Sequence, residues 1–356
     1  MTAQPFDTQV RAALKHGTVI PAHPLALDAD GRFDERHQRA LTRYYAATGA
    51  GGIAVGVHTT QFAIRDARVG LFEPVLTLAA EEMDRADART SVPLIRIGGI
   101  CGRTDQALRE ADLLVRLGYH AGLLSLAALA KSDDDALIRH CEAVGARIPL
   151  IGFYLQPSVG GRLLSYDFWR RFAEIPAVVA IKIAPFNRYH TLDVVRAVID
   201  TGRTDIALYT GNDDAIVVDL VTPFRFRVNG QRVERRIVGG LLGHWAVWTR
   251  CAVVLLADCQ AAAHSTHVPT ELLRRGVETT DANAAFFDAA HGFAGCIAGI
   301  QEVLRRQGLV ASSRCLDPRD TLSPGQAAEI DRVYRAYPDL ADDDFVRMHL
   351  EEWMKC

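Results

Sequence analysis

The sequence predicts an α/β fold, a (β/α)₈ TIM barrel with a C-terminal helical extension. Eight short apolar runs alternate with helical patterns between residue 18 and about residue 262. Eight such units in about 245 residues match the count and size of a barrel of this class. A doubly wound open sheet is the alternative, but no GxGxxG opens a helix after the first run.

The eight runs have the character of strands that are buried on both faces. Each is short, rich in Val, Ile and Leu, and bounded by Gly or Pro, as expected in a parallel sheet. In order along the chain they are 18–25, 52–57, 93–99, 121–126, 149–156, 178–184, 206–213 and 238–244.

Helical segments between the runs carry their own start and stop signals. Ser132 and Asp135 have capping-box spacing, Ser165 is a candidate N-cap, and Gly145 and Gly202 follow the last apolar turns of two helices. The aromatic stripe at Phe168, Trp169 and Phe172 indicates core packing.

One insertion, 222–238, interrupts the pattern after the seventh helix and before the eighth strand. Asn229-Gly230 predicts a two-residue type I′ turn between two alternating strands. The hairpin has an apolar face (Phe224, Phe226, Val228, Val233) and an arginine face (Arg225, Arg227, Arg232). It belongs to the N-terminal end of the barrel, as a surface decoration or as a subunit contact.

The domain division follows from the loss of strands after the eighth unit. Residues 1–264 form the barrel, with the hairpin inserted at 222–238. Residues 265–356 carry helical periodicity only, which predicts a C-terminal helical region packed on the barrel.

Composition excludes several classes of function. A net charge of −3 and a hydrophobic content of 49% favour a folded enzyme-sized core and argue against binding of nucleic acid or an anionic membrane. No window of eighteen apolar residues and no N-terminal apolar leader segment is present. Seven dispersed cysteines without CxxC spacing indicate reduced thiols, so we expect a cytoplasmic protein.

The candidate site follows from the ends of the predicted strands, where barrel enzymes place their chemistry. Lys182 lies inside the apolar stretch "AIKIA", and a charge on a buried strand costs several kcal/mol of desolvation. Tyr154 and Thr59 end two other strands, so we expect the three side chains to project into one mouth.

These residue types fit one chemistry. A lysine in an apolar interior has a lowered pKa, and its neutral amine attacks a ketone to give an imine that stabilises a carbanion. A tyrosine can carry protons, and hydroxyl and backbone N–H groups can hold a carboxylate. The combination describes a class I aldolase for a 2-oxo acid. The plainer interpretation is a lysine that extends to solvent and a structural tyrosine.

The chain also resembles the dihydrodipicolinate synthase / N-acetylneuraminate lyase family over nearly its whole length. The stretches that carry the resemblance are "IPAHPLALDADGRFD", "GGIAVGVHTTQF", "IGFYLQP", "VVAIKIA", "YTGNDD" and "LSPGQAAEIDRV". The tyrosine and lysine motifs, 28 residues apart, are the most specific of them.

The resemblance implies roles for particular residues. Lys182 is then the Schiff-base lysine and Tyr154 the proton-relay tyrosine. His58 and Thr59 match the pair that holds the substrate carboxylate, and the hydroxyl of Thr59 is expected to help the proton relay as a third catalytic group. Gly211 and Asn212 are expected to line the mouth at the seventh strand, with Leu242 and Gly243 at the eighth. The family implies a homo-oligomer, a dimer or tetramer, without a cofactor or metal.

Departures from the family pattern argue against dihydrodipicolinate synthase itself. His58 replaces a threonine, Thr60-Gln61 replaces Gly-Glu, and the tyrosine that the synthases lend across the dimer has no counterpart. Val159, Ile183 and Phe186 are apolar replacements, which favour an aromatic or small hydrophobic second substrate over a sugar acid.

Three alternatives stay open at the level of sequence. The first is a related imine-dependent dehydratase or hydratase-aldolase, and the second is a barrel that binds a keto acid without turnover. The third is a metal-dependent enzyme with His23, His58 and His244 near strand ends, although no HxH or HExxH occurs.

Overall fold

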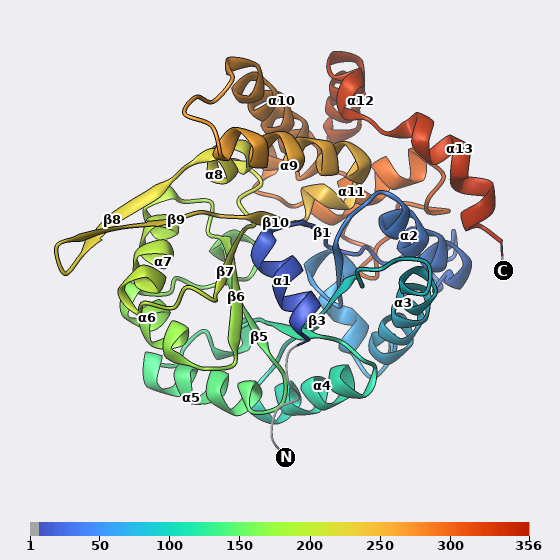
Figure 1. Ribbon diagram of the computed structural model, residues 1–356. Coiled ribbons are helices and arrows are strands. Elements are labelled where there is room, and N and C mark those ends of the chain that lie inside the picture. Colours follow the sequence, from blue (N-terminus) through green and yellow to red (C-terminus); the bar gives the residue numbers. More distant parts are fainter. Residues whose placement is uncertain (1–6, 356) are drawn as a thin grey trace.

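The computed structural model describes residues 7–355 and contains the predicted barrel (Figure 1). Its eight parallel strands are β1 (Val19–Pro21), β2 (Gly52–Val55), β3 (Ile95–Ile100), β4 (Ala121–Leu124), β5 (Leu150–Leu155), β6 (Val178–Ala184), β7 (Ala207–Thr210) and β10 (Gly239–Leu242). They follow the order β1-β10-β7-β6-β5-β4-β3-β2, and a bridge between Ala22 and Ala54 closes the circle. Every strand overlaps one of the predicted apolar runs.

Helices surround the strands, one after each. They are α2 (Glu35–Ala47), α3 (Phe72–Asp87), α4 (Thr104–Arg116), α5 (Asp134–Gly145), α6 (Tyr166–Glu174), α7 (Arg188–Asp200), α8 (Ile216–Val221) and α9 (Thr249–Ala263). Ser165 caps α6 as predicted, and Gly202 after α7 has a φ of +71°. The cap of α5 is Asp133 rather than Ser132, because the Asp133 carboxylate accepts from the amide of Ala136 at 2.8 Å.

Alternation along the strands separates two apolar cores. On β5, Ile151 and Phe153 face the barrel interior, whereas Leu150 and Tyr154 pack in the layer between strands and helices. This alternation follows from the two-residue period of a strand, so it decides which side chains can reach the interior.

A short N-terminal helix, α1 (Thr8–His16), lies across the end of the barrel where the strands begin (Figure 1). Its Val10 and Leu14 belong to the interior core, and the hydroxyl of Tyr209 donates to the carbonyl of Leu14 at 2.9 Å. The helix therefore closes that end, which leaves the carboxyl end of the strands as the open one.

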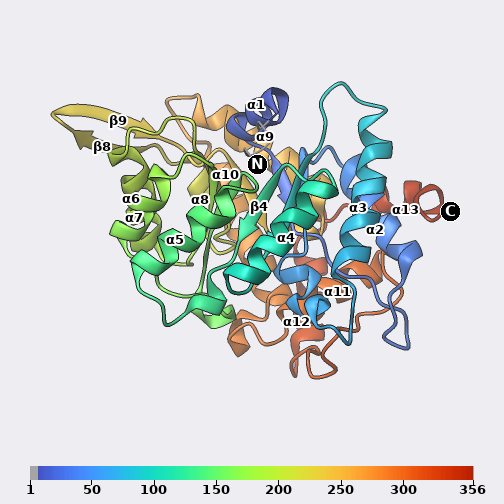
Figure 2. The same cartoon turned by 90° about the horizontal axis from the view of Figure 1, so that it is seen from below.

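The predicted hairpin is present as β8 (Phe224–Val228) and β9 (Gln231–Arg235). Asn229 and Gly230 both have positive φ, +49° and +80°, as a type I′ turn requires. The hairpin contacts α7 and lies at the same end of the barrel as α1 (Figure 2). It is a separate two-stranded sheet whose apolar face packs on the main core, away from the candidate site.

The C-terminal region consists of α10 (Thr270–Phe286), α11 (Cys296–Arg306), α12 (Gln326–Ala336) and α13 (Asp343–Trp353). Two buried amides join it to the loops that follow β1 and β2. The side chain of Gln301 donates to the carbonyl of Leu25 at 2.6 Å, and the backbone amide of Leu316 donates to the side chain of Gln61 at 2.7 Å. Within residues 7–355 no helix is long and apolar enough to cross a membrane.

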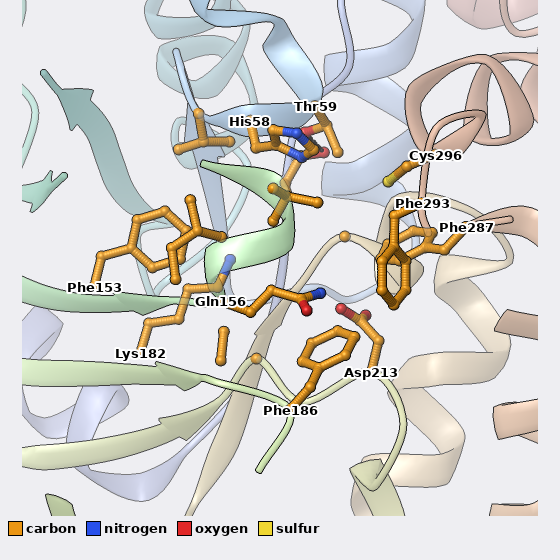
Figure 3. Close-up of a pocket in the computed structure, with 17 residues that line it drawn as sticks. His58, Thr59, Phe153, Gln156, Lys182, Phe186, Asp213, Phe287, Phe293 and Cys296 are labelled. Atoms are coloured by element: carbon orange, nitrogen blue, oxygen red, sulfur yellow. Dashed lines mark hydrogen bonds between the residues drawn. The ribbon is translucent and has the colours of Figure 1, made fainter. Parts of the chain in front are cut away.

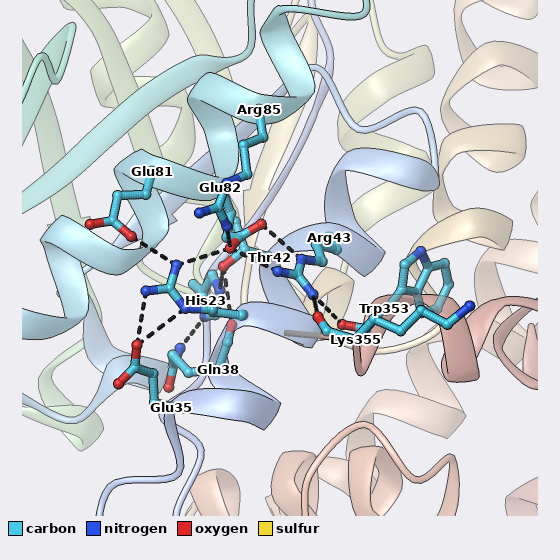
Figure 4. Close-up of polar contacts among 11 residues, drawn as sticks. His23, Glu35, Gln38, Thr42, Arg43, Glu81, Glu82, Arg85, Trp353 and Lys355 are labelled. Atoms are coloured by element: carbon cyan, nitrogen blue, oxygen red, sulfur yellow. Dashed lines mark hydrogen bonds and ion pairs between the residues drawn. The ribbon is translucent and has the colours of Figure 1, made fainter.

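A buried carboxylate, Glu82, joins α2 to α3 (Figure 4). Its side chain is 1% exposed and accepts from Arg39 at 2.9 Å and from the Nε of Arg43 at 2.8 Å. Arg43 also donates to the backbone carbonyls of Trp353 and Lys355 at the end of α13. One carboxylate thereby fixes Arg39 and Arg43 of α2, and Arg43 also holds the end of the C-terminal helix.

We predict that Glu82→Ala lowers the free energy of unfolding by about 3 kcal/mol, because removing one partner of a buried ion pair leaves the other charges uncompensated. Urea unfolding at neutral pH measures the change. Glu81→Ala is the matched control: Glu81 is 46% exposed, so its loss should cost under about 1 kcal/mol. Equal effects of the two substitutions would contradict the role given to Glu82.

Candidate active site

A cavity opens where the barrel strands end, with about 530 Å³ of empty space including open solvent. Its lining residues, drawn in Figure 3, come from six barrel strands and their loops and from the C-terminal region. They are Ala22, Val57, His58, Thr59, Phe153, Leu155, Gln156, Val159, Lys182, Ala184, Phe186, Gly211, Asp213, Gly243, Phe287, Phe293 and Cys296.

Lys182 projects into this cavity from the middle of β6. It is one of four lysines in the chain and is 7% exposed. Its amine makes no hydrogen bond within residues 7–355 and lies 4.5 Å from the centre of the Phe153 ring. Burial lowers the pKa of Lys182 below its ordinary value of 10.5, while the charge of Asp213 opposes the shift. The amine is thus biased toward its neutral, nucleophilic form.

Gly211 gives the lysine its space. A Cβ at this position would lie 2.7 Å from Lys182 Cε, 3.1 Å from Lys182 Cγ and 2.7 Å from Ala184 Cβ. Such contacts are closer than carbon atoms tolerate, so the extended lysine stem requires glycine beside it.

Asp213 follows two residues later, in the loop after β7. It is 4% exposed, and its Oδ1 accepts from the backbone amide of His244 at 3.0 Å. Burial raises the pKa of this carboxyl, while the His244 amide and the charge of Lys182 oppose the rise. The lysine and the aspartate titrate as a pair, and each shifts the protonation of the other.

His58 and Thr59 belong to a 3₁₀ turn, His58–Thr60, that follows β2. Burial, reinforced by the charge of Lys182, lowers the pKa of His58 to about 4, so its imidazole is neutral at neutral pH. The hydroxyl of Thr59 donates to the backbone carbonyl of Ala22 at 2.7 Å. It therefore ties the end of β1 to the loop after β2.

Aromatic rings form the wall opposite the lysine. Phe186 follows β6, whereas Phe287 and Phe293 come from the segment between α10 and α11. Phe186 and Phe293 meet edge to face with ring centres 5.7 Å apart, and both have positive φ, +50° and +70°. A left-handed backbone costs a non-glycine residue about 1 kcal/mol, so packing of this pair outweighs local strain.

Five of the site residues predicted from the sequence line the cavity together. These are Lys182, His58, Thr59, Gly211 and Gly243. The glycines bring backbone close to the open space, and His58 and Thr59 lie on the far side from Asp213 (Figure 3).

Tyr154 does not line the cavity, which corrects the expectation that it projects into the mouth of the barrel. Phe153 pairs with Lys182 in register and faces the interior, so the next residue must face the helices. The Tyr154 ring packs 5.3 Å from that of Trp169 on α6, and its hydroxyl donates to the carbonyl of Leu164 at 3.2 Å.

Asn212 and Leu242 also lie outside the cavity lining. Asn212 braces the loops: its Oδ1 accepts from the amide of Phe186 at 3.0 Å, and its Nδ2 donates to Asp219 at 2.9 Å. Leu242 is fully buried in the layer between strands and helices. Ile183 faces the same layer, so of the apolar replacements only Val159 and Phe186 shape the cavity.

The sequence reasoning missed Asp213, Gln156, Phe153 and the aromatic residues after α10. Asp213 had a signal, because it follows Gly211 and Asn212 at a strand end. Phe153 required the in-or-out phase of β5, which an apolar run does not reveal. Within residues 7–355 no group of three or more His, Cys, Asp or Glu side chains is placed to hold a metal ion.

The fold and site define a class: a (β/α)₈ barrel with a buried lysine among the ends of its strands. The sequence model of the dihydrodipicolinate synthetase family matches residues 15–222. The chain belongs to this family.

Relatives and solved structures agree with that assignment. A 4-hydroxy-tetrahydrodipicolinate synthase of Bifidobacterium longum (strain DJO10A) is 28% identical over 211 residues, covering 58% of this chain. The match covers 64% of that relative's length. Among solved structures, the dihydrodipicolinate synthase of Acinetobacter baumannii, complexed with pyruvate, has a TM-score of 0.71 at 18% identity, covering 90% of this chain and 98% of that one. The N-acetylneuraminate lyase of Fusobacterium nucleatum has a TM-score of 0.70 at 16% identity, covering 91% and 99%.

We predict that Gly211→Ala lowers the free energy of unfolding by about 1–3 kcal/mol, the usual cost of overpacking, because its methyl group overlaps the lysine stem. A double-mutant cycle with Lys182→Ala, followed by urea unfolding, isolates the contact. The cost of the alanine should shrink when the lysine stem is absent. An equal cost in both backgrounds would show that Lys182 does not occupy the space beside Gly211.

Proposed function

We propose that this protein is a class I carbon–carbon lyase, an aldolase whose Lys182 forms a Schiff base with pyruvate or another 2-oxo acid. The observation that carries the proposal is the buried amine of Lys182, which has no hydrogen bond among the described residues and is directed into a cavity at the carboxyl end of the barrel. Family membership supports it, because the Bifidobacterium relative is a synthase.

The chemistry starts from the neutral amine, which burial favours. Its nitrogen adds to the ketone carbon, water leaves, and the C=N⁺ bond that forms accepts electrons from the neighbouring carbon. Loss of a proton, or of an aldehyde, at that carbon gives an enamine. The enamine is the common intermediate for making or breaking the C–C bond.

The substrate carboxylate has a place beside the lysine. His58 and Thr59 begin a short helical turn at the cavity, and the His58 imidazole, neutral at neutral pH, can donate a hydrogen bond without adding a full charge. Gly211 and Gly243 leave backbone exposed on neighbouring loops. Together these groups favour a small planar 2-oxo acid.

The other half of the cavity favours an apolar partner molecule. Phe186, Phe287, Phe293 and Val159 line it, and they present no hydrogen-bonding side-chain groups to the hydroxyls of a sugar acid. Aromatic rings bury apolar surface and stack on other rings. An aldehyde with an aromatic or small hydrophobic group is therefore the preferred second substrate.

A second candidate function is a barrel that binds a keto acid without turnover. The outward position of Tyr154 favours it, since the expected proton relay is absent from the cavity.

The Schiff base predicts a covalent adduct. Incubation with pyruvate and sodium borohydride should add one reduced pyruvate to the intact mass of the wild type, because borohydride reduces the imine to a stable amine. The Lys182→Ala variant should gain nothing, whereas Lys131→Ala, which lacks an exposed lysine, should label like the wild type. If longer 2-oxo acids and pyruvate all leave the wild type unlabelled, the proposal fails.

The rate of adduct formation should follow the lowered pKa of Lys182. Below that pKa the amine is protonated and slow, so the initial rate rises with pH and stops rising well below 10.5, the ordinary lysine value. Quenched mass spectrometry across pH 5 to about 11 measures the profile. A rate that keeps climbing to about pH 10.5 would mean an amine in an ordinary aqueous environment.

A further inference from the structure

Imine chemistry needs a group that moves protons at the reacting atoms, and the cavity contains few candidates. Tyr154 is excluded because its hydroxyl donates to the carbonyl of Leu164 behind β5. Thr59 is excluded because its hydroxyl is occupied by the carbonyl of Ala22. Gln156 has an amide that neither gains nor loses a proton at ordinary pH.

Two further side chains, Cys296 and His58, have pKa values that make them poor proton carriers at neutral pH. Burial raises the pKa of the Cys296 thiol, so it is held as a neutral thiol and is a weak acid and base. His58 has its pKa lowered to about 4, so at neutral pH it holds no extra proton to donate. Asp213 remains.

The geometry of Asp213 suits a proton carrier. The His244 amide fixes one carboxyl oxygen at 3.0 Å, and the other has no hydrogen-bond partner within residues 7–355. Figure 3 shows the carboxyl group directed into the cavity that Lys182 enters, with the side chain of Gln156 between them. The fixed oxygen orients the group, and the unpaired oxygen is available to a substrate.

We propose that Asp213 is the catalytic acid and base of this site, a role that rests on the proposed Schiff-base function and replaces the tyrosine turned away behind β5. The neutral carboxyl donates its proton to the carbinolamine oxygen, which leaves as water while the nitrogen lone pair forms the C=N⁺ bond. The amine, the ketone and the acid are thereby converted to an iminium, water and a carboxylate. The carboxylate then removes a proton from the next carbon to give the enamine, and the acid is restored.

The surroundings of Asp213 keep the proton where this step requires it. Burial holds the carboxyl pKa above its ordinary value, and the same burial lowers the pKa of Lys182. The titratable groups around it are Lys182 from β6, Asp214 in its own loop, His244 after β10 and Cys296 on α11, while His58 faces it from across the cavity. The pKa values of His58 and His244 are lowered to about 4, so both imidazoles are neutral at neutral pH and Lys182 is the cation of this group. The amine of Lys182 and the carboxyl of Asp213 therefore share one proton between them.

Asp213→Asn tests the role, because asparagine keeps the acceptor for the His244 amide and removes the transferable proton. With pyruvate and borohydride, the rate of adduct formation should fall by about 10²–10⁴-fold, the usual contribution of general acid–base catalysis. In the wild type the rate should fall on the alkaline side of the pH profile, where the Asp213 carboxyl has lost its proton. This fall should be absent in Asp213→Asn. Asp135→Asn is the matched control: Asp135 is 66% exposed on α5 and does not line the cavity, so the labelling rate of this variant should stay within about threefold of the wild type.

Tyr154→Phe separates this role from the family's usual relay. It should label at a rate near that of the wild type, because the lost hydroxyl bonds only Leu164. Circular dichroism and urea midpoints establish that each variant is folded. An Asp213→Asn protein that labels at the wild-type rate, or a Tyr154→Phe protein that loses labelling instead, overturns the inference alone. If none of the 2-oxo acids labels the wild type, the proposed function is overturned, and the role of Asp213 with it.

Discussion

The site depends on one physical constraint, a lysine amine that lies inside an apolar barrel and has no hydrogen-bonding partner in the part of the chain that the structure describes. Burial of a charge there costs several kcal/mol, and the protein offsets it by letting the amine lose its proton and by placing a carboxyl nearby. The neighbouring positions follow from this constraint. Gly211 leaves room for the lysine stem, and Phe153 presents its ring to the amine. The bond from the His244 amide keeps Asp213 in the cavity.

The C-terminal helices are part of the site rather than an appendage to it. Phe287, Phe293 and Cys296 line the cavity, and the bonds from Gln301 and Leu316 hold this region on the loops after β1 and β2. At the far side of the molecule, Arg43 fixes the end of α13 through the same carboxylate that joins α2 to α3. Stability of the extension and shape of the cavity are therefore linked.

Much of the fold could be predicted from the sequence because buried parallel strands leave short, continuous apolar runs with Gly or Pro at their ends. All eight barrel strands overlap such runs, and the Asn229-Gly230 turn fixes the hairpin. The phase of β5 could not be predicted, since Phe153 and Tyr154 are both apolar enough for either face. The register with β6 decides it, and that register is a tertiary property. The aromatic wall could not be predicted either, because the residues after α10 contact the barrel only in the folded chain. Helix α1 closes the barrel through Val10 and Leu14, two positions that precede the first predicted strand, where the sequence predicts no element.

The most direct measurement is a crystal structure of the protein soaked with a 2-oxo acid and reduced with borohydride. We expect continuous density from Lys182 Nζ to the second carbon of the acid. The unpaired oxygen of Asp213 should lie within hydrogen-bonding distance of the new bond, and Tyr154 should still bond Leu164 behind β5. Density for the acid away from Lys182, or a Tyr154 hydroxyl turned into the cavity beside the adduct, would contradict this view of the site.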